Sequence, residues 1–160
     1  MKIRKAELSD SKELVEKFIS FKKEFDLVVT KFFQNKRSEL KPFEEIEEYI
    51  QKNISDPNRL FLVAIEADKI IGFACGSVET DERPIFPNLL MGKLRTIWVS
   101  QEHRGKGVAS QLRDKLFAFF KEKNVDYIEI ITMCGNKNSN SMYKKWGFEN
   151  HLNSYVKGVD

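Results

Sequence analysis

The segment from Leu94 to Met133 constrains the fold of this chain more than any other part of the sequence. It opens with an apolar run, Leu94 to Val99, and a glycine-containing segment, 101–107. Apolar residues then recur at helical spacing through 108–120, and Tyr127 to Met133 is a second strand-like run. A strand, a helix and a strand in this order predict a right-handed crossover that makes the two strands parallel neighbours in one sheet.

The N-terminal part of the chain predicts helices and antiparallel strands around this crossover. Residues 2–7 predict a strand, and Asp10 with Glu13 has the spacing of a capping box at the start of a helix. A second amphipathic helix is expected over 43–54. The β-branched and apolar runs Leu60 to Ile65 and Ile70 to Val78, with a turn at Ala67-Asp68-Lys69, predict a hairpin.

The remaining segments complete the predicted class. Residues 79–92 are expected to form a connection, Ser139 to Trp146 a short helix, and Phe148 onward a terminal pair of short strands. We therefore predict an α+β fold with a mixed, mostly antiparallel central sheet flanked by helices. No repeat, low-complexity tract or linker divides the sequence, so we expect one domain over 1–160.

The composition excludes several classes of protein. Hydrophobic residues make up 41% and charged residues 32%, which is typical of globular domains, and thirteen Phe suggest a core rich in rings. A net charge of +3 is too small to indicate nucleic-acid binding. No apolar run reaches the roughly 18 residues needed to span a bilayer. The N-terminus lacks the apolar region of a secretory signal, so we expect no membrane association and a cytoplasmic location.

The two cysteines and two histidines do not indicate a metal site. Cys75 and Cys134 lie within apolar stretches, without a CxxC spacing or a nearby histidine. His103 and His151 each stand alone. We expect two reduced thiols, as is usual in a reducing compartment, and no bound metal.

The junction between the first crossover strand and its helix carries a candidate anion site. Its sequence, from Arg104 to Ala109, is Arg104-Gly105-Lys106-Gly107-Val108-Ala109. A helix that begins here directs unpaired N–H groups and the positive end of its dipole outward, and glycine lets an anion approach the main chain. Neither GxGxxG nor GxxxxGK[ST] fits this segment. The pattern predicts a phosphate or pyrophosphate site of another type.

Two motifs in this sequence resemble those of the GNAT family of N-acetyltransferases. The first is Arg104-Gly-Lys-Gly107-Val-Ala109, which is similar to the family signature Arg/Gln-x-x-Gly-x-Gly/Ala. The second, Asn136-x-x-Ser139-x-x-x-Tyr143-x-x-x-Gly147-Phe148, resembles Asn-x-x-Ala-x-x-x-Tyr-x-x-x-Gly-Phe, with serine in place of alanine. Both motifs occur in family order, and the N-terminal strand and helix start also look like those of the family.

The resemblance implies a fold and a set of site residues. Its sheet would contain a splayed strand pair, and acetyl-CoA would be the co-substrate of direct transfer to an amine in a ternary complex. The segment Ile97-Trp98-Val99 would bind the pantetheine arm through main-chain groups of Ile97 and Val99, and 104–109 would bind the pyrophosphate. Asn136 would hydrogen-bond the cofactor arm, and Tyr143 would also contact the cofactor and protonate the leaving sulfur as general acid. Homodimers are common in the family.

This sequence departs from the family at the general base. Many members carry a glutamate on the strand before the pyrophosphate loop, whereas here that strand reads Lys93-Leu-Arg-Thr-Ile-Trp-Val99. Glu79, at the end of the preceding strand, is a possible base, acting directly or through a water. A solvated strand-end charge explains Glu79 as well, since glutamate is commonly exposed.

The resemblance implies that the acceptor is a primary amine of a small molecule or of a peptide or protein. The first two helices and residues 79–92 are expected to form its surface, with five phenylalanines that are alternatively core residues: Phe25, Phe32, Phe33, Phe43 and Phe86. A non-catalytic module that binds acyl-CoA as a sensor is the alternative function. A nucleic-acid role would rest only on a pI of about 8.8 and on the abundance of lysine.

Overall fold

The computed structural model describes residues 1–31, 33, 41–82 and 87–157. The chain forms two compact units, one of residues 1–18 with 41–131 and the other of residues 19–40 with 132–160. None of the helices among the described residues is both long enough and apolar enough to cross a membrane.

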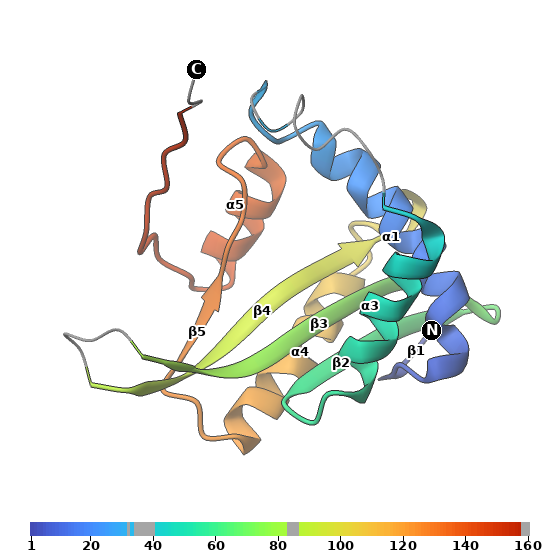
Figure 1. The fold of residues 1–160 in the computed structure, drawn as a ribbon, viewed down its shortest axis with the longest axis horizontal. Coiled ribbons are helices and arrows are strands. Elements are labelled where there is room, and N and C mark those ends of the chain that lie inside the picture. The colour runs from blue at the N-terminus through green and yellow to red at the C-terminus, as the bar shows by residue number, and fades with distance from the viewer. Residues whose placement is uncertain (32, 34–40, 83–86, 158–160) are drawn as a thin grey trace. The chain divides into compact units, whose positions relative to one another are not determined.

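The first unit is built on a five-stranded sheet in which the strands lie in sequence order (Figure 1). Its strands are β1 (Lys2–Lys5), β2 (Arg59–Glu66), β3 (Lys69–Asp81), β4 (Leu89–Val99) and β5 (Tyr127–Ile130). Neighbours from β1 to β4 are antiparallel, whereas β4 and β5 are parallel. The predicted mixed sheet with one parallel crossover is confirmed.

The hairpin of β2 and β3 turns through Ala67 and Asp68. Both residues have positive φ, 49° and 58°. Two consecutive residues in this left-handed region form the turn whose twist matches that of a two-stranded hairpin. The expected hairpin is therefore confirmed, with a two-residue loop.

The parallel pair of strands separates partway along its length. Paired positions run from Met91↔Tyr127 to Leu94↔Ile130. Beyond Leu94, β4 continues to Val99, and among the described residues its strand partner there is β3 alone. This confirms the splayed pair, and β5 ends at Ile130, three residues earlier than the sequence suggested.

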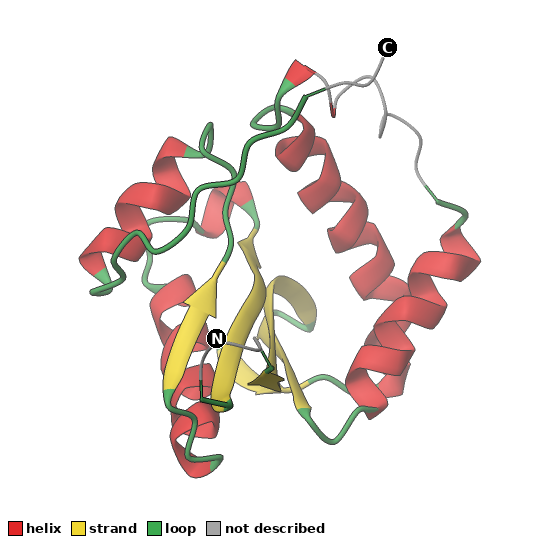
Figure 2. Ribbon diagram, turned by 60° about the vertical axis from the view of Figure 1, so that its left-hand side comes forward, coloured by secondary structure: helices red, strands yellow, loops and turns green. Residues whose placement is uncertain are grey.

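Helices and short 3-10 turns accompany the strands in the described ranges (Figure 2). The helices are α1 (Ser11–Asp26), α3 (Phe43–Ser55), α4 (Val108–Glu122) and α5 (Lys137–Lys145), and the 3-10 turns are Leu8–Asp10 and Gln101–His103. In the first unit, α4 packs on one face of the sheet. The N-terminal part of α1 and α3 pack on the other face.

The α4 face is closed by apolar side chains of the sheet and the helix. Leu112, Leu116 and Phe120 of α4 are fully buried. The ring of Phe120 lies against two glycines of the sheet, because a Cβ added at Gly76 or Gly92 would come within 2.7 or 2.8 Å of that ring. The absence of side chains at these positions on β3 and β4 therefore allows α4 to pack closely on the strands that lead to the glycine loop.

The opposite face is lined by aromatic rings, as the phenylalanine content suggested. Phe18 stacks on Phe73 at 4.6 Å between ring centroids, and Phe73 stacks in turn on Trp98 at 5.7 Å. Phe61 lies beside both phenylalanines. This stack fixes α1 over β3 and β4 in the first unit.

Three details of the sequence prediction are wrong. Asp10 does not pair with Glu13 as a capping box; its carboxylate accepts hydrogen bonds from Arg4 and from the main-chain N–H of Glu7, while Glu13 accepts one from the N–H of Ile70. The predicted connection over 79–92 is shorter, because β3 extends to Asp81 and β4 begins at Leu89. Residues 148–157 form no strand.

Candidate active site

The predicted anion loop lies between the end of β4 and the first turn of α4. Gly105 and Gly107 have φ of 74° and 80°, the left-handed region that favours glycine, and Gly107 is the residue that precedes the helix. A Cβ added at either glycine would meet no atom within 4 Å. The N–H groups of Val108 and Ala109 belong to the first turn and have no partner within the helix. The loop thus offers open main-chain donors at the positive end of α4.

Two side chains tie this loop to the sheet. Arg104 donates from Nε to the carbonyl oxygen of Val99 over 2.8 Å. The His103 ring lies 2.8 Å from the hydroxyl of Ser100 through Nδ1, and 3.2 Å from a carboxylate oxygen of Glu66 through Nε2. Arg104 thus holds the loop to the end of β4, and His103 holds it to Glu66 at the end of β2. Lys106 adds a positive charge beside it.

The edge of β4 leads directly into this loop. Ile97, Trp98 and Val99 lie beyond the last residue paired with β5, so main-chain groups on that side of β4 have no strand partner in the described part of the chain. An extended ligand with amide groups can pair with such an edge. Trp98 is largely buried by its stack on Phe73, which leaves its main chain rather than its ring to contact a ligand.

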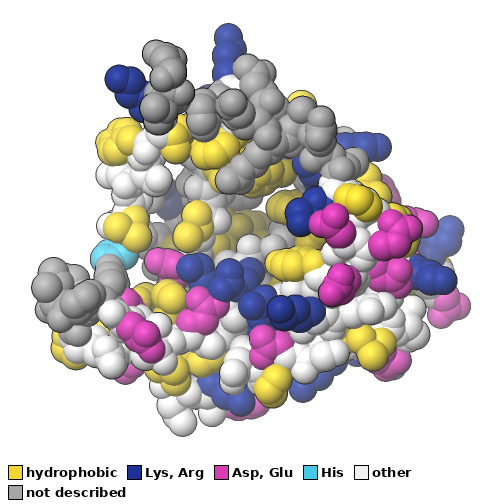
Figure 3. Space-filling model, in the orientation of Figure 1, with side chains coloured by type: hydrophobic (Ala, Val, Ile, Leu, Met, Phe, Trp, Pro, Cys, Tyr) yellow, Lys and Arg dark blue, Asp and Glu magenta, His cyan; other side chains and the backbone are white. Residues whose placement is uncertain are grey.

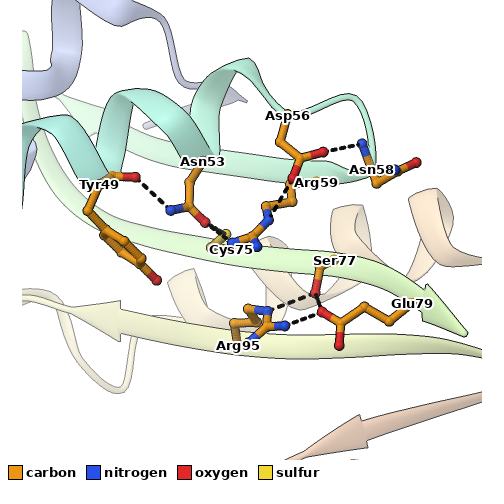
Figure 4. A network of polar contacts seen from close by, with 9 residues as sticks. All are labelled: Tyr49, Asn53, Asp56, Asn58, Arg59, Cys75, Ser77, Glu79 and Arg95. Carbon is orange, nitrogen blue, oxygen red and sulfur yellow. Dashed lines mark hydrogen bonds and ion pairs between the residues drawn. The ribbon is translucent and has the colours of Figure 1, made fainter. Parts of the chain in front are cut away.

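A β-bulge in β4 places an arginine on the sheet face that carries the aromatic stack. The register passes from Cys75↔Thr96 to Gly76↔Leu94, so Arg95 has no opposite residue on β3. Its guanidinium donates from Nε to the hydroxyl of Ser77 over 2.8 Å and from Nη2 to Oε1 of Glu79 (Figure 4). Glu79, the candidate base, is thus held by an arginine that the sequence analysis did not single out.

The pKa of Glu79 reflects two opposing effects. Burial of the carboxyl group raises the pKa, but hydrogen bonds from Ser77 and Arg95 and the nearby charges of Arg95 and Lys93 outweigh this effect, and the net pKa is lowered. The Ser77 hydroxyl donates over 2.6 Å to the same oxygen, Oε1, that accepts from Arg95. Glu79 is therefore ionised at neutral pH and is a weaker base than an unperturbed glutamate.

A second polar cluster extends from α3 over the same face (Figure 4). Arg59 pairs with Asp56 at 3.0 Å and also donates to the side-chain oxygen of Asn53. The Cys75 thiol lies 3.9 Å from that oxygen, and burial raises the pKa of this thiol to about 11. Cys75 is therefore a protonated, buried side chain, whereas Cys134 is exposed.

The two predicted site residues of the second motif lie in the second unit. Asn136 caps α5, its side-chain oxygen accepting from the N–H of Ser139 over 3.1 Å. Tyr143 lies on α5, with its ring 5.7 Å from Trp146 and 6.1 Å from Phe148. Burial raises the pKa of Tyr143, and an interaction with Ser139 offsets this only in part. The phenol is therefore fully protonated at neutral pH.

The structure groups the predicted residues in two sets. Glu79, the strand segment 97–99 and the loop 104–109 belong to the first unit, and Asn136 and Tyr143 to the second. Of the phenylalanines considered for the acceptor surface, Phe43 is 41% exposed, Phe25 and Phe33 are half-buried, and Phe32 and Phe86 lie outside the described residues. Within the described ranges, no group of three or more His, Cys, Asp or Glu is placed to hold a metal.

Arg95 was missed because a β-bulge leaves no signal in an alternation pattern. Strict alternation through Leu94 to Val99 places Arg95 on the face opposite Leu94, but gives no reason to separate it from an ordinary solvated arginine. The available signal was indirect: an arginine within an otherwise apolar strand directly before the glycine loop.

Comparison with known proteins identifies the family of this chain. The model of the family described as "Acetyltransferase (GNAT) family" matches residues 23–148. No curated protein matches the sequence.

Solved structures share the fold at low sequence identity. A mutant of the BH1408 protein from Bacillus halodurans is 16% identical with a TM-score of 0.82, and the match covers 99% of each chain. A ribosomal-protein-alanine N-acetyltransferase from Brucella melitensis biovar Abortus 2308 is 19% identical with a TM-score of 0.68, covering 99% of this chain and 100% of that one. Aminoglycoside N-acetyltransferase AAC(6')-Iy, in complex with CoA, is 17% identical with a TM-score of 0.74, covering 99% and 93%.

Proposed function

Because this chain belongs to the GNAT family of acetyltransferases, we propose that it transfers the acetyl group of acetyl-CoA to a primary amine by direct attack in a ternary complex. One observation carries the proposal: the open edge of β4 leads into a glycine loop at the N-terminus of α4. The edge of β4 provides main-chain partners for an amide-containing arm, and the glycine loop that follows it provides donors for a diphosphate.

The residues of the first unit fit the coenzyme. A Cβ at Gly105 or Gly107 would meet no atom within 4 Å, so the loop has the open space that a bulky diphosphate requires. The amides of 104–109 bind the diphosphate, and Lys106 adds positive charge. The main-chain groups of Ile97 and Val99, on either side of Trp98, bind the pantetheine arm. Asn136 belongs to the second unit, and its side-chain oxygen is used by the α5 cap; its proposed role is to donate to that arm from its amide nitrogen.

The chemistry requires the nitrogen of the acceptor to lose two protons and the sulfur of the coenzyme to gain one. The acceptor arrives as an ammonium ion with a pKa of about 10.4 for a lysine-type amine, so a proton leaves before its nitrogen can attack. Glu79 accepts this proton directly or through a water. As the new C–N bond forms, the C–S bond of the thioester breaks, and Tyr143 donates its phenolic proton to the departing sulfur. The second proton that the nitrogen loses as it becomes an amide returns, directly or through water, to the phenolate of Tyr143. The products are the N-acetylated amine and the free thiol of CoA.

The pKa shifts of Tyr143 and Glu79 support their proposed roles as proton donor and proton acceptor. The raised pKa of Tyr143 keeps its proton available at neutral pH. The lowered pKa of Glu79 keeps the carboxylate ionised and able to hold an ammonium group, although it limits the strength of the base. A carboxylate with a lowered pKa is better suited to pass the proton of the amine on through a water than to keep that proton itself. We further propose one acetyltransferase domain over 1–160, supported by end-to-end matches to the neighbouring structures.

The test has a binding arm and a turnover arm. Acetyl-CoA should raise the melting temperature of the protein, because it binds only the folded state. Gly107→Glu, which puts a carboxylate in the diphosphate loop, should abolish that shift. Release of free thiol from acetyl-CoA in the presence of a panel of amines reports transfer.

Each result has a distinct meaning. Stabilisation together with amine-dependent thiol release supports the proposal. Stabilisation without release by any amine indicates a binding module that does not transfer acetyl groups. No stabilisation by acetyl-CoA at millimolar concentration overturns the proposed function.

A further inference from the structure

Arg95 and Glu79 form a pair whose polar groups are only partly used. Within the described part of the chain, the guanidinium uses Nε and one N–H of Nη2, and the carboxylate uses Oε1 alone. The outer edge of the guanidinium, formed by Nη1 and the second N–H of Nη2, and the oxygen Oε2 of Glu79 remain for other partners. Both side chains are about one-third exposed, 33% and 32%.

The position of this pair relates it to the reacting groups. Arg95 is the first residue of β4 beyond the last pair with β5, Leu94↔Ile130. Under the proposed function, the coenzyme arm extends from the loop at 104–109 back past Val99 and Ile97. Its acyl end is then directed toward Arg95, so the acceptor meets this part of the sheet.

Neighbouring charges on the same face are already paired. Lys93 forms an ion pair with Glu129 at 3.2 Å, and Tyr127 donates to Asp81 over 2.7 Å. Charged side chains of both signs gather across the middle of the face seen in Figure 3. The pair of Arg95 and Glu79 therefore differs from its neighbours in offering a two-donor edge beside an unused carboxylate oxygen.

From this arrangement we propose that the acceptor is a free amino acid, a molecule that carries a carboxylate a few bonds from its amine. The outer guanidinium edge of Arg95 binds the carboxylate through two parallel hydrogen bonds. Oε2 of Glu79 accepts a hydrogen bond from the ammonium group, and the proton that the amine loses before attack leaves by way of this oxygen, directly or through a water. The inference rests on the proposed function and gives it a substrate class.

The same geometry disfavours other amines. The amino terminus of a peptide has an amide where a free amino acid has its carboxylate, and an alkyl amine or polyamine has no anion at all. Either would leave the outer edge of Arg95 without its partner. A dianionic phosphate suits a site with two free cations, whereas here Arg95 already pairs with Glu79 and Lys93 with Glu129.

The test compares acceptors that share one side chain. L-leucine, L-leucinamide and isopentylamine form one such set, and L-phenylalanine, its amide and phenethylamine form another; free thiol is measured with each. The free amino acids should have kcat/KM values roughly tenfold or more above those of their amides and decarboxylated amines, since a charge-assisted bidentate contact is lost in the latter. O-phosphoethanolamine against ethanolamine tests phosphate recognition.

A variant series assigns the preference to Arg95. Arg95→Gln should raise KM for the free amino acids roughly ten- to a hundredfold and remove the preference over the decarboxylated amines. Arg95→Lys should restore part of it, because the charge remains without the fork. Arg113→Gln, the same change on α4 where the arginine pairs with Asp114, is the control and should match the wild type. Calorimetry with CoA shows that each variant is folded.

Failure of the inference is distinguishable from failure of the proposed function. Turnover of amines without preference for a carboxylate, or an unchanged preference in folded Arg95→Gln, overturns the amino-acid assignment and leaves the acetyltransferase proposal intact. A preference for O-phosphoethanolamine also overturns it. Coenzyme binding without thiol release from any acceptor overturns both.

Discussion

The guanidinium of Arg104 donates a hydrogen bond of 2.8 Å to the carbonyl oxygen of Val99, which ties the first residue of the glycine loop to the last residue of β4. Both residues were expected to contact the coenzyme, but this bond gives Arg104 a role in holding the loop as well. The geometry of Nε matters for that role, and positive charge alone does not replace it.

Replacing Arg104 by lysine separates the two roles. Arg104→Lys keeps the charge and loses the directed bond, so we expect KM for acetyl-CoA to rise roughly tenfold while kcat changes little. Steady-state kinetics at saturating acceptor measures this. Arg113→Lys on α4 is the control. An unchanged KM would mean that charge at this position is sufficient.

Two substitutions at Gly107 separate the effect of backbone strain from the effect of a charged side chain in the loop. Gly107→Ala meets no neighbouring atom but must adopt φ of 80°, so it should cost about 1 kcal/mol of stability and retain CoA binding. Gly107→Glu should lose binding. Gly147→Ala, with φ of 87° and open space, is the control for strain in denaturation experiments. Normal calorimetric affinity in Gly107→Glu contradicts the assignment of the diphosphate loop.

Tyr143→Phe removes the proposed general acid while preserving the ring. We expect kcat to fall roughly a hundredfold with coenzyme binding nearly intact. Tyr155→Phe, at a residue that is 91% exposed, is the matched control. An unchanged kcat in Tyr143→Phe removes Tyr143 from the acid role.

The pH profile gives an independent test of Tyr143. Because burial raises the pKa of Tyr143, the proton donor persists beyond the ordinary tyrosine value of about 10. Any loss of kcat caused by Tyr143 ionisation should therefore appear only above that pH. An alkaline limb that persists in Tyr143→Phe belongs to another group.

Asp10 makes stability depend on pH at the start of α1. Its carboxylate accepts two hydrogen bonds from Arg4, at 2.7 and 2.9 Å, and this contact is the main cause of its lowered pKa. Because the folded-state pKa is below the unfolded value, the stabilisation is present above the ordinary aspartate pKa and is lost as pH falls through the lower folded-state value. Asp10→Asn should therefore lower the free energy of unfolding by about 1–3 kcal/mol at neutral pH.

Urea denaturation at neutral pH and at pH near 3 measures the effect of Asp10→Asn. The difference from wild type should shrink at the lower pH. Asp114→Asn, at an exposed ion pair with Arg113, is the control and should cost less than about 1 kcal/mol. A difference that stays constant over this range would exclude the ion pair as its source.

The sequence predicted the fold where periodicity and connection order determine it. The crossover from β4 through α4 to β5 follows from an apolar run, a glycine segment and a helical repeat, and the hairpin from the turn at Ala67 and Asp68. Polar contacts between elements were less accessible. Asp10 was expected to form a capping box with Glu13, whereas it forms one with Glu7 and also pairs with Arg4 on β1.

The candidate site was predictable where it depends on local residue types and not where it depends on the pairing of strands. The loop conformation at Gly105 and Gly107 was expected from residue type, since positive φ favours glycine. The ion pair of Arg95 and Glu79, two residues sixteen apart in sequence, was not expected. It depends on the bulge that separates Arg95 from the ladder, and the position of this bulge is set by the register of β3 against β4. The roles of Asn136 and Tyr143 remain predictions.

The parting of β4 from β5 beyond Leu94 has a consequence for handling the protein. In the part of the chain that the structure describes, this row of main-chain donors and acceptors has no strand beside it, and such a row is a template for any extended polypeptide, including another copy of the same chain. A coenzyme arm that occupies this edge would shield it. Ligand-free preparations are therefore the ones in which strand-to-strand aggregation should begin, and the acyl donor should act as a solubilising agent for the enzyme that consumes it.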